Sequence, residues 1–343
     1  MLIKNKLPTL ADVADHAGVS RSTVSLYLNG KLHRMGKSTQ EKIARAIEAV
    51  GYTLDPIARS LSTGKTFTIG LAWDASNYEY YFEDIYFMFF AKKVAQYLSA
   101  RNYSLMLVDP GDMKNKYKMT DGMIVKATEP IWGYVSEIGA IHENYPIVSL
   151  GKFRQESEIA SVSVDDVEAG RGAIAFLSRA HRHIHVLSFP RGRIIGFDER
   201  VEGAIAGAQA LGVQLTVDYG EMSEAYGNAV VSRLHQADAL PDALFCLNDI
   251  TAIGALKAAK DLGVAVPGKL SIMGVDDTPS VSYCLGLSTI RHPIGDLADA
   301  VCELIFDGIA HPEIRLTPRR MRTTLVERAT TKPESPSREE NAL

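Results

Sequence analysis

The stretch Thr9–Gly30 (TLADVADHAGVSRSTVSLYLNG) constrains the fold of this 343-residue chain more than any other. Apolar residues recur at helical spacing between Leu10 and Ala17, which predicts a first helix with one apolar face. Gly18 follows where a helix end requires positive φ, and Ser20 is a favoured N-cap residue for a second helix. The stretch therefore predicts two short helices joined by a tight turn.

The second helix of this pair has one face suited to contact with DNA. We expect Val24 and Leu28 to turn inward. Arg21, Ser22 and Ser25 are then exposed. Small polar side chains permit close approach to the major groove, and an arginine there can read guanine. Helix pairs that only pack against their neighbours have the same spacing, so the pattern alone leaves both interpretations open.

Charge is distributed unevenly along the chain. Residues 1–65 contain ten Lys or Arg and five Asp or Glu, a net charge of +5, whereas the whole chain has −4 and the remainder therefore −9. A basic head on an acidic body is typical of a phosphate-binding module joined to a domain that does not bind DNA. A solvated charged surface is the alternative, and the charge alone does not exclude it.

The composition is that of a soluble globular protein, with 46% hydrophobic and 23% charged residues. No apolar run is long enough to span a bilayer and no apolar leader follows the N-terminus, so we expect a cytoplasmic protein without a membrane partner. Cys246, Cys284 and Cys302 form no CxxC pair and are expected to be reduced thiols. No cofactor or metal site is predicted.

The remaining pattern predicts a change of fold class after the first domain. A third helix is expected over 38–50, and Asp55 followed by Pro56 predicts a short helix of about two turns. From Phe67 onward, apolar strands alternate with helices. The strands are predicted at 67–73, 105–108, 122–125, 147–150, 184–189, 243–247 and 270–274, the helices at 82–103, 167–179, 197–211, 250–262 and 294–309, and an extended segment at 322–328. Such repeats predict parallel sheets covered by helices, with ligands beyond the carboxyl ends of the strands.

Several further motifs follow the helix pair in order. They are ARSL at Ala58–Leu61, DGMIV, VDDVEAG, RVEGA, FCLNDITAIGALKAAKDLGVAVPGKLSIMGVDD and LSTIRHP. In this order and spacing, the chain from Thr9 to about Thr330 resembles the lactose-repressor (LacI/GalR-type) family of bacterial transcriptional regulators.

The resemblance implies a small all-α helix-turn-helix headpiece with a hinge helix, followed by a two-lobed α/β core with a periplasmic-binding-protein-like fold. The implied domains are 1–52 for the helix-turn-helix, 53–66 for the hinge helix and linker, 67–330 for the effector-binding and dimerisation core, and 331–343 for a disordered tail. The first lobe is expected at about 67–160 plus 292–319, and the second at about 161–291 plus 320–330.

Carried over by position, the resemblance implies DNA contacts in the headpiece and hinge from Thr9, Ser20, Arg21, Ser22, Thr23, Ser25, Asn29, Tyr52, Ala58 and Leu61. Arg21 and Ser22 would face base edges, and short polar side chains would contact phosphates. Leu61 would wedge into the minor groove and kink the duplex, with packing of the hinge on the core as its alternative role. Most relatives carry Arg where this chain has Leu26, so guanine readout from that position is absent.

The resemblance also places effector contacts in the cleft between the lobes, at Arg200, Asn248, Asp276 and His292. Such side chains can hydrogen-bond adjacent hydroxyls, which suits a sugar or sugar derivative. Tyr80 and Tyr81, which follow the first strand, are candidate stacking rings. Phe82 and Trp132 are further candidates, with core or dimer packing as the alternative for all four. Lys126 ends a strand; pointing into the cleft it would favour an anionic group on the ligand, and a surface lysine is the alternative.

The implied function is that of a dimeric, sequence-specific transcriptional repressor whose affinity for near-palindromic operator DNA depends on a small effector. A sugar-binding protein without gene-regulatory role is the alternative, which a basic headpiece does not fit. An enzyme is not expected, because GxxxxGK[ST], GxSxG and HExxH motifs are absent. One departure concerns the fold: the short interval between Val108 and Asp121, which includes Pro110 and Gly111, predicts that the first lobe lacks a crossover helix.

Overall fold

The computed structural model describes residues 8–28, 30–53, 56–73, 85–142, 144–155, 159–279 and 281–333. Its contacts divide the chain into two compact units, Met1–Thr66 and Phe67–Leu343, which we call the headpiece and the core. Within the described ranges, no helix combines the length and the apolarity that crossing a lipid bilayer requires.

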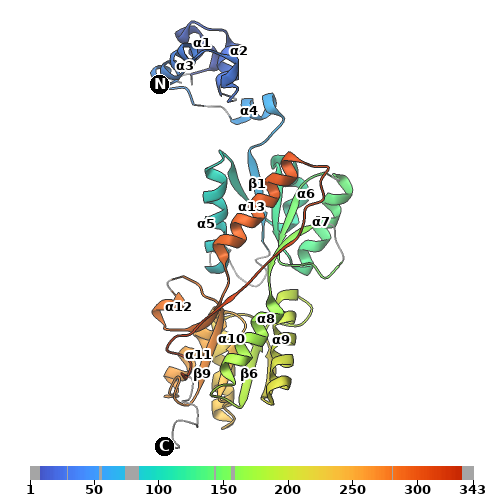
Figure 1. Ribbon diagram of the computed structural model, residues 1–343, viewed down its shortest axis with the longest axis vertical. Coiled ribbons are helices and arrows are strands. Elements are labelled where there is room, and N and C mark those ends of the chain that lie inside the picture. The colour runs from blue at the N-terminus through green and yellow to red at the C-terminus, as the bar shows by residue number, and fades with distance from the viewer. Residues whose placement is uncertain are drawn as a thin grey trace, which may run out of the picture. The chain divides into compact units, whose positions relative to one another are not determined.

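The headpiece is helical (Figure 1). Its helices are α1 (Leu10–Ala17), α2 (Arg21–Leu28), the 3-10 helix η1 (Leu32–Arg34), α3 (Lys37–Val50) and α4 (Pro56–Thr63). Helices α1, α2 and α3 enclose a small apolar core made by Val13, Ala14, Val24, Ile43 and Ala46. The predicted pair of short helices and the third helix are confirmed.

The turn between α1 and α2 depends on its capping residues. Gly18 ends α1 with φ of 65°, in the left-handed region that favours glycine. The Ser20 hydroxyl accepts a hydrogen bond from the Thr23 N–H at 3.1 Å, which is the expected N-cap contact. At the other end of α1, the Thr9 N–H donates to Asp12 Oδ2 at 2.7 Å in a capping box. Local contacts therefore fix both ends of α1 and the start of α2.

The core has two lobes, each built on a six-stranded sheet (Figure 1). The first sheet is parallel, with the order β11-β5-β4-β3-β1-β2, and the second has the order β12-β10-β9-β8-β6-β7, with only the edge strand β12 antiparallel to its neighbour. The strands are β1 (Thr68–Ala72), β2 (Ser104–Val108), β3 (Gly122–Lys126), β4 (Ile147–Leu150), β5 (Ala160–Val164), β6 (His183–Ser188), β7 (Gln214–Tyr219), β8 (Ala243–Cys246), β9 (Ser271–Asp276), β10 (Ser288–Arg291), β11 (Arg319–Met321) and β12 (Thr324–Val326).

Helices cover both faces of each sheet and bury four apolar clusters. In the first lobe, α5 and α13 pack on one face and α6 and α7 on the other; in the second, α8 and α9 face α10 and α11 across the sheet. The helices of the core are α5 (Ile85–Ser99), α6 (Met113–Lys116), α7 (Glu129–Ile141), α8 (Asp166–Leu177), α9 (Ile195–Leu211), α10 (Glu224–Gln236), α11 (Asp249–Asp261), α12 (Val281–Cys284) and α13 (Ile294–Ala310). The predicted α/β class with parallel sheets is confirmed.

Two glycines allow α8 and α9 to pack unusually closely. A Cβ on Gly170 would lie 2.0 Å from the carbonyl oxygen of Arg200, and a Cβ on Gly203 would lie 2.0 Å from that of Val167. No side chain larger than hydrogen fits at either position. The contact holds the N-terminal ends of α8 and α9 together at the interlobe side of the sheet.

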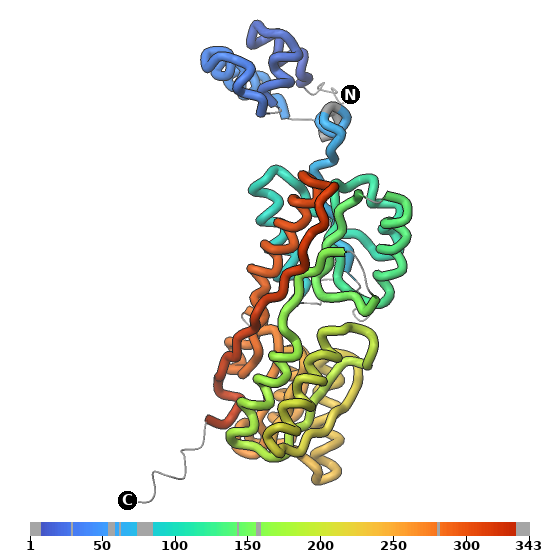
Figure 2. Tube along the Cα trace, turned by 45° about the vertical axis from the view of Figure 1, so that its right-hand side comes forward, coloured from blue at the N-terminus to red at the C-terminus, as the bar shows by residue number. Residues whose placement is uncertain are grey.

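The chain crosses between the lobes three times within the described residues. The crossings follow β5, β10 and β11, and Figure 2 shows the segment after α13 returning along the core to the second lobe. The predicted lobe boundaries at 160/161 and 319/320 are therefore wrong by a few residues. Residues 160–164 and 319–321 both pair within the first sheet, because β5 is hydrogen-bonded to β4 on one side and to β11 on the other.

The predicted absence of a crossover helix between Val108 and Asp121 is also wrong. Three short helical pieces fill this interval, η3 (Pro110–Asp112), α6 and η4 (Tyr117–Met119). Pro110 begins the first piece, and the Asp109 carboxylate caps it by accepting from the Gly111 N–H at 2.9 Å. The 3-10 turns advance further per residue than an α-helix, so few residues suffice. Met113 and Tyr117 are buried against the sheet, as the apolar side chains of a crossover helix would be.

The tail begins later than predicted. Thr331, expected at the start of the disordered tail, is buried in the second lobe beside the buried Thr330. The Thr330 hydroxyl donates to the Ile272 carbonyl oxygen at 2.7 Å, and the Thr331 hydroxyl lies 2.7 Å from that of Ser288. Short hydroxyl side chains thus tie this segment to strands β9 and β10. The predicted tail beyond 333 lies outside the described residues.

Candidate DNA interface and effector cavity

The exposed face of α2 presents Arg21 and Ser22, while Val24 is fully buried. Ser25 and Leu26 are half-buried. Leu26 therefore offers a small apolar surface at the position where the sequence resemblance led us to expect an arginine in most relatives. This arrangement leaves Arg21 as the cationic side chain of α2 that can reach base edges.

Three hydroxyls gather at the start of α2. The Ser20 hydroxyl lies 2.7 Å from that of Ser22 and 2.8 Å from that of Thr23. Because the Ser20 hydroxyl also accepts the cap hydrogen bond, its orientation is set by the protein. A hydroxyl can donate to and accept from a phosphate or a base edge, which fits the predicted role of all three.

The other predicted DNA contacts lie around this surface. Thr9 is held in the capping box of α1, and the half-buried ring of Tyr52 packs against the headpiece core. Leu61 on α4 is 84% exposed, so its side chain is not packed in the hinge helix. Ala58 lies in α4, but its side chain is outside the described part of the structure, as is Asn29 altogether.

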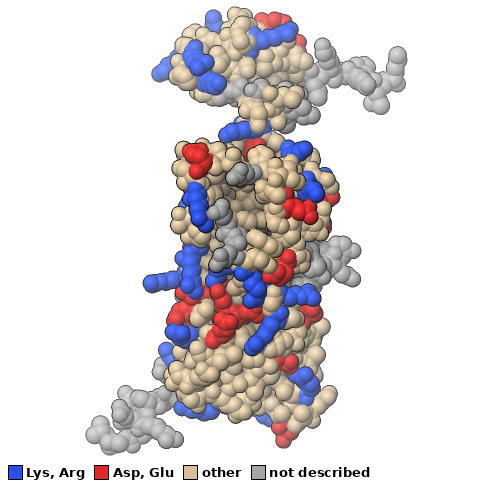
Figure 3. All heavy atoms as spheres, turned by 90° about the vertical axis from the view of Figure 1, so that its right-hand side faces the viewer, with Lys and Arg blue, Asp and Glu red and all other residues tan. Residues whose placement is uncertain are grey.

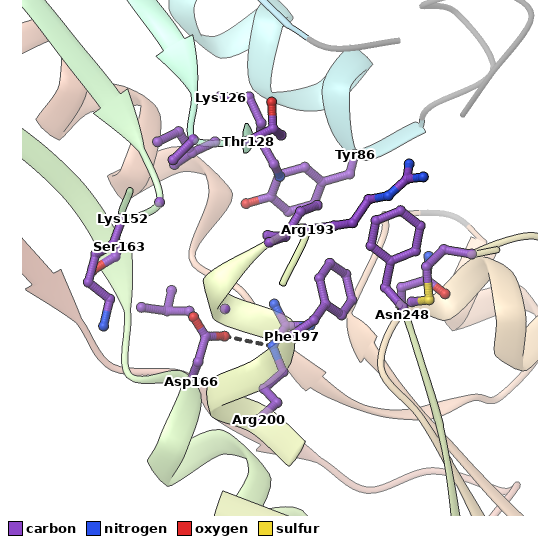
Figure 4. Close-up of a pocket in the computed structure, with 18 of the residues that line it drawn as sticks. Tyr86, Lys126, Thr128, Lys152, Ser163, Asp166, Arg193, Phe197, Arg200 and Asn248 are labelled. Carbon is purple, nitrogen blue, oxygen red and sulfur yellow. Dashed lines mark hydrogen bonds and ion pairs between the residues drawn. The ribbon is translucent and has the colours of Figure 1, made fainter. Parts of the chain in front are cut away.

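A cavity of about 680 Å³ lies between the two lobes of the core. Residues at or just after the carboxyl ends of strands from both sheets line it, among them Lys126, Val164, Phe189, Asn248 and Asp276. This is the place where parallel sheets bind ligands. Figure 3 shows Lys, Arg, Asp and Glu side chains gathered in a band across the middle of the core. Figure 4 shows the cavity with part of its lining.

The second-lobe wall is organised around a buried ion pair. Arg200 Nε donates to Asp166 Oδ1 at 2.6 Å and Nη1 donates to the Leu247 carbonyl oxygen at 2.7 Å. The guanidinium also lies 4.6 Å from the centre of the Phe197 ring, and both members of the pair are more than nine-tenths buried. Burial raises the pKa of the Asp166 carboxyl, and the charge of Arg200 opposes that rise.

Asn248 stands beside this pair at the start of α11. Its Oδ1 accepts a hydrogen bond from the Thr251 N–H at 3.0 Å and caps the helix. The cap leaves the two amide donors of the side chain for other partners. The predicted cleft residues Arg200 and Asn248 are therefore brought together on one wall, in fixed orientations.

Asp276 and His292 also line the cavity. His292 Nδ1 is 3.6 Å from Asp276 Oδ1, and its Nε2 is buried without a hydrogen-bond partner among the described residues. Burial first, and then the charges of Arg200 and Lys126, hold the pKa of His292 well below its ordinary value of 6.5. The ring is therefore neutral at neutral pH and can exchange a hydrogen bond with a ligand. Asp276 has φ of 117°, a strained conformation for a residue with a side chain.

The first-lobe wall carries Lys126 on aromatic rings. Lys126 ends β3, and its Nζ lies 4.6 Å from the centre of the Trp73 ring and 5.3 Å from that of Tyr86. These distances are typical of cation–π contacts. The Tyr86 ring also meets His292 edge-on with the ring centres 5.9 Å apart. Lys126 thus lines the cavity, which is the first of the two positions considered from the sequence.

Sequence reasoning missed the rings that line the cavity. These rings are Trp73, Tyr86, Phe189 and Phe197. Two of them immediately follow strands, so the rule that ligands bind beyond strand ends could have found them. Trp132, by contrast, packs against Phe153 with ring centres 5.1 Å apart and is not among the lining residues. Tyr80, Tyr81 and Phe82 lie outside the described residues.

Two ion pairs join the lobes beside the cavity. Lys152 Nζ, after β4, is 2.5 Å from Glu199 Oε1 on α9, and Arg154 Nη2 is 2.5 Å from Asp198 Oδ2. Within the described part of the chain, no group of acidic, histidine and cysteine side chains could hold a metal ion. Asp277, which follows the cavity residue Asp276 in the chain, forms ion pairs with Arg291 and Arg328.

Two family models match the chain. Residues 9–55 match the model of bacterial regulatory proteins of the lacI family, and residues 173–331 match that of the periplasmic binding protein-like domain. The chain is 26% identical to the HTH-type transcriptional repressor PurR of Photorhabdus laumondii, over 94% of its own length and 96% of that protein.

Solved structures show the same architecture. A lac repressor dimer bound to operator and the anti-inducer ONPF is similar with a TM-score of 0.78 and 21% identity, over 96% of this chain and 100% of that one. A complex of the transcriptional regulator CelR with cellobiose is similar with a TM-score of 0.69 and 23% identity, over 94% of this chain and 99% of that one. The chain therefore combines a helix-turn-helix domain of the lacI family of bacterial regulatory proteins with a periplasmic binding protein-like domain, which is the organisation of a DNA-binding transcriptional regulator.

Proposed function

We propose that this regulator is a repressor that binds a near-palindromic operator as a homodimer, and that a sugar or sugar derivative in the interlobe cavity controls its affinity for DNA. The cavity is the observation that carries the proposal. It combines aromatic rings with polar groups from both lobes, within the size range of small-molecule sites. The similar regulator bound to cellobiose supports a sugar as the ligand class.

The second-lobe wall is suited to hydroxyl groups. Arg200 and Asn248 are held by bonds to the protein, and each retains donors for a ligand. Asp276 supplies carboxylate oxygens that accept from hydroxyls. The rings of Phe197 and Tyr86 offer faces on which the C–H side of a pyranose or furanose ring can pack. Together these groups can fix the orientation of a polyol.

In the proposed mechanism the effector acts by bridging the lobes. A ligand that touches both walls favours the arrangement in which the walls approach, and this shifts the population of the core. In a homodimer that associates through its first lobes, a change in the lobe arrangement would also change the spacing of the two hinge helices, because β1 follows α4 directly in the chain. Ordering of α4 on DNA would then depend on the ligand.

At the operator, Arg21 and Ser22 of each subunit would read base edges, and Leu61 would enter the minor groove. We expect Arg21→Ala to weaken operator binding by about 1–3 kcal/mol and to relax preference at one base pair in each half-site. Equal loss on all DNA sequences would show that Arg21 contacts only phosphate. Its control is Lys42→Ala, which removes an exposed cation on α3 rather than on α2.

The test of the whole proposal is selection of binding sites from random duplex DNA, followed by titration of the selected site with and without sugars. We expect two inverted half-sites and an affinity that changes with a ligand that binds the core. A chain that binds sugars but shows no preference among DNA sequences would favour a sugar-binding protein without gene-regulatory role. Operator affinity that no bound ligand alters would remove the allosteric part.

A further inference from the structure

A buried carboxylate stands directly behind the second-lobe wall of the cavity. Asp249 follows Asn248 in the chain and is 2% exposed, but it is not among the residues that line the cavity. Among the residues that the structure describes, no cation lowers the pKa of its carboxyl. A buried carboxylate without a cationic partner is costly unless several donors satisfy it. The donors around Asp249 therefore show what this residue holds.

Three hydrogen bonds satisfy the Asp249 carboxylate, and all three come from the segment that follows β9. Oδ2 accepts from the Thr278 N–H at 2.9 Å and from the Ser282 hydroxyl at 2.5 Å, and Oδ1 accepts from the Thr289 hydroxyl at 2.8 Å. Burial raises the pKa of the Asp249 carboxyl, and these three donors oppose that rise. Gly274 on β9 provides the room, because a Cβ there would lie 2.3 Å from Asp249 Oδ1.

The turn Asp276–Thr278, to which Asp249 is bonded, has a strained backbone. Asp276 has φ of 117° and Asp277 has φ of 52°, so two successive residues with side chains lie in the region that favours glycine. Such conformations persist only where the surrounding structure fixes them. The Thr278 N–H donates directly to Asp249. The Asp277 N–H donates at 3.4 Å to Thr289 Oγ1, whose own hydrogen goes to Asp249.

Two arginines hold the turn from another side. Asp277 Oδ2 is 2.6 Å from Arg291 Nε, and Oδ1 is 2.7 Å from Arg328 Nη2. Arg328 also donates to the Leu287 carbonyl oxygen at 2.7 Å. Arg291 ends β10 and Arg328 follows β12, so both ion pairs tie the turn to neighbouring strands of its own sheet. Asp249 ties the turn to α11 instead.

The turn and the start of α11 carry residues that line the cavity. Asn248 caps α11, and Asp276 begins the turn. The His292 N–H donates to the Asp276 carbonyl oxygen at 3.2 Å, so this third lining residue is tied to the same turn. Because Asp249 is adjacent to Asn248 in the chain and bonded to the turn, it sets the spacing between the two parts of the wall.

We propose that Asp249 is a positioning residue of the effector site, whose buried carboxylate holds the strained turn Asp276–Thr278 at a fixed distance from Asn248. A ligand then meets groups that are already in place, which lowers the entropic cost of binding. Asp249 acts through these groups and does not itself line the cavity. The inference rests on the proposed function for its effect on a ligand, whereas the hold on the turn is measured without one.

The first test is hydrogen exchange of the ligand-free, full-length protein, measured by mass spectrometry on the peptide that contains Asp277 and Thr278. We expect Asp249→Ala to speed exchange of these amides at least about 10-fold, because their N–H groups lose the acceptor that fixes them. Asp249→Asn should retain part of the protection, because the amide oxygen can still accept from the Thr278 N–H.

The matched control is Asp242→Ala, at the opposite end of the same sheet. Asp242 precedes β8, and its carboxylate accepts from the N–H groups of Arg182 and His183 at 2.9 Å each. Its loss also removes hydrogen bonds to two successive backbone N–H groups of the second lobe, but not those of the turn. Exchange at Asp277 and Thr278 should therefore match that of the unaltered protein.

Two hydroxyl variants report on the turn even if Asp249→Ala does not fold. Thr289→Val keeps the size of the side chain but removes the hydroxyl between Asp249 and the Asp277 N–H. Exchange of the Asp277 amide should rise about 3- to 10-fold. Ser282→Ala removes a hydroxyl from the same carboxylate but none from the turn, so exchange of the turn should change less than about twofold.

The second test compares ligand affinity with stability. The full-length protein is titrated calorimetrically with cellobiose, ribose and a panel of further hexoses and pentoses, and the sugar that binds most tightly is then titrated into each variant. We expect Asp249→Ala to weaken its binding about 10- to 50-fold and Asp249→Asn to weaken it less. Asp242→Ala should change the affinity less than about twofold. A merely structural role of Asp249 would lower stability and leave the affinity of the folded protein unchanged.

Two results overturn the inference. One is exchange of the turn that neither Asp249→Ala nor Thr289→Val alters. The other is a sugar affinity that Asp249→Ala leaves unchanged although exchange of the turn rises. Sugars that alter operator affinity equally in the unaltered and the Asp249→Ala proteins would defeat this inference and leave the proposed function intact. If no sugar binds and exchange still rises as expected, the sugar effector is defeated and the hold of Asp249 on the turn is supported.

Discussion

The second-lobe wall of the cavity holds its polar side chains in place by bonds to the protein, whereas the first-lobe wall rests a lysine on aromatic rings and leaves a buried hydroxyl unpaired. Arg200 and Asn248 represent the first kind, and Lys126 and Thr128 the second. Groups already bonded are preorganised, so binding costs them little entropy. The second-lobe wall is thus the more preorganised of the two.

The largest expected effect comes from breaking the ion pair that organises the second-lobe wall. Arg200→Met leaves the Asp166 carboxyl buried without its partner, and we expect the free energy of unfolding to fall by about 3–5 kcal/mol. Chemical denaturation measures this loss. The double variant Arg200→Met with Asp166→Asn should recover part of it, because the orphaned charge is gone. A loss below about 1 kcal/mol would mean that solvent reaches Asp166 and that this wall is not preorganised.

A smaller loss is expected from separating the helices that carry this pair. In Gly203→Ala, the new Cβ meets the Val167 carbonyl oxygen, and α8 and α9 must move apart. We expect a loss of about 1–3 kcal/mol in the free energy of unfolding, with weaker effector binding.

The matched control for this substitution lies one helix away. Gly172 is within α8, and a Cβ there meets nothing within 4 Å. Gly172→Ala should therefore stabilise the protein by up to about 1 kcal/mol, through helix propensity alone. Equal effects of the two substitutions would show that the close packing of α8 on α9 does not hold the wall together.

The pH dependence of stability tests His292, which lies where the two walls of the cavity meet. Its pKa is held below 6.5 in the folded protein, so the unfolded chain binds a proton first as the pH falls. Stability is therefore complete above about pH 6.5 and declines below it, by up to about 1.4 kcal/mol per pH unit for each such histidine. Burial lowers the pKa of His181 and of His185 too, so they contribute in the same direction.

Substitution isolates the share of His292 in this decline. His292→Gln should flatten the fall in the free energy of unfolding below about pH 6.5, while His181 and His185 retain their part. Thermal denaturation of both proteins over the same pH series gives the difference. A slope unchanged by His292→Gln would mean that this ring takes up a proton in the folded state as readily as in the unfolded chain.

The two walls also differ in how far they could be predicted. Arg200, Asn248, Asp276 and His292 lie in or beside motifs of the lacI family, and all four line the cavity. Each follows a strand or belongs to the first turns of a helix, so local pattern and topology suffice to place it.

The first-lobe wall depends on packing between distant segments. Trp73 from the end of β1 and Tyr86 from α5 become a platform for Lys126 only when sheet and helix come together. The Thr128 hydroxyl lacks a hydrogen-bond partner among the described residues. This property depends on all the neighbours that surround it in the fold, so it cannot be predicted from a sequence pattern. The edge strand β7 and helix α10 were missed for a related reason, since their partly exposed polar residues weaken the apolar period.

The smallest expected effect concerns the ion pairs that join the walls. Lys152 and Glu199 are 32% and 21% exposed, so solvent screens the pair and Lys152→Met should cost less than about 1 kcal/mol of stability. Because the pair bridges the lobes, its loss also weakens the arrangement that a bridging effector favours, by about 2- to 5-fold in affinity. Lys114→Met is the control, since it breaks an exposed pair with Glu137 inside the first lobe. If both variants bind the effector equally well, the approach of the two walls is set by the ligand alone.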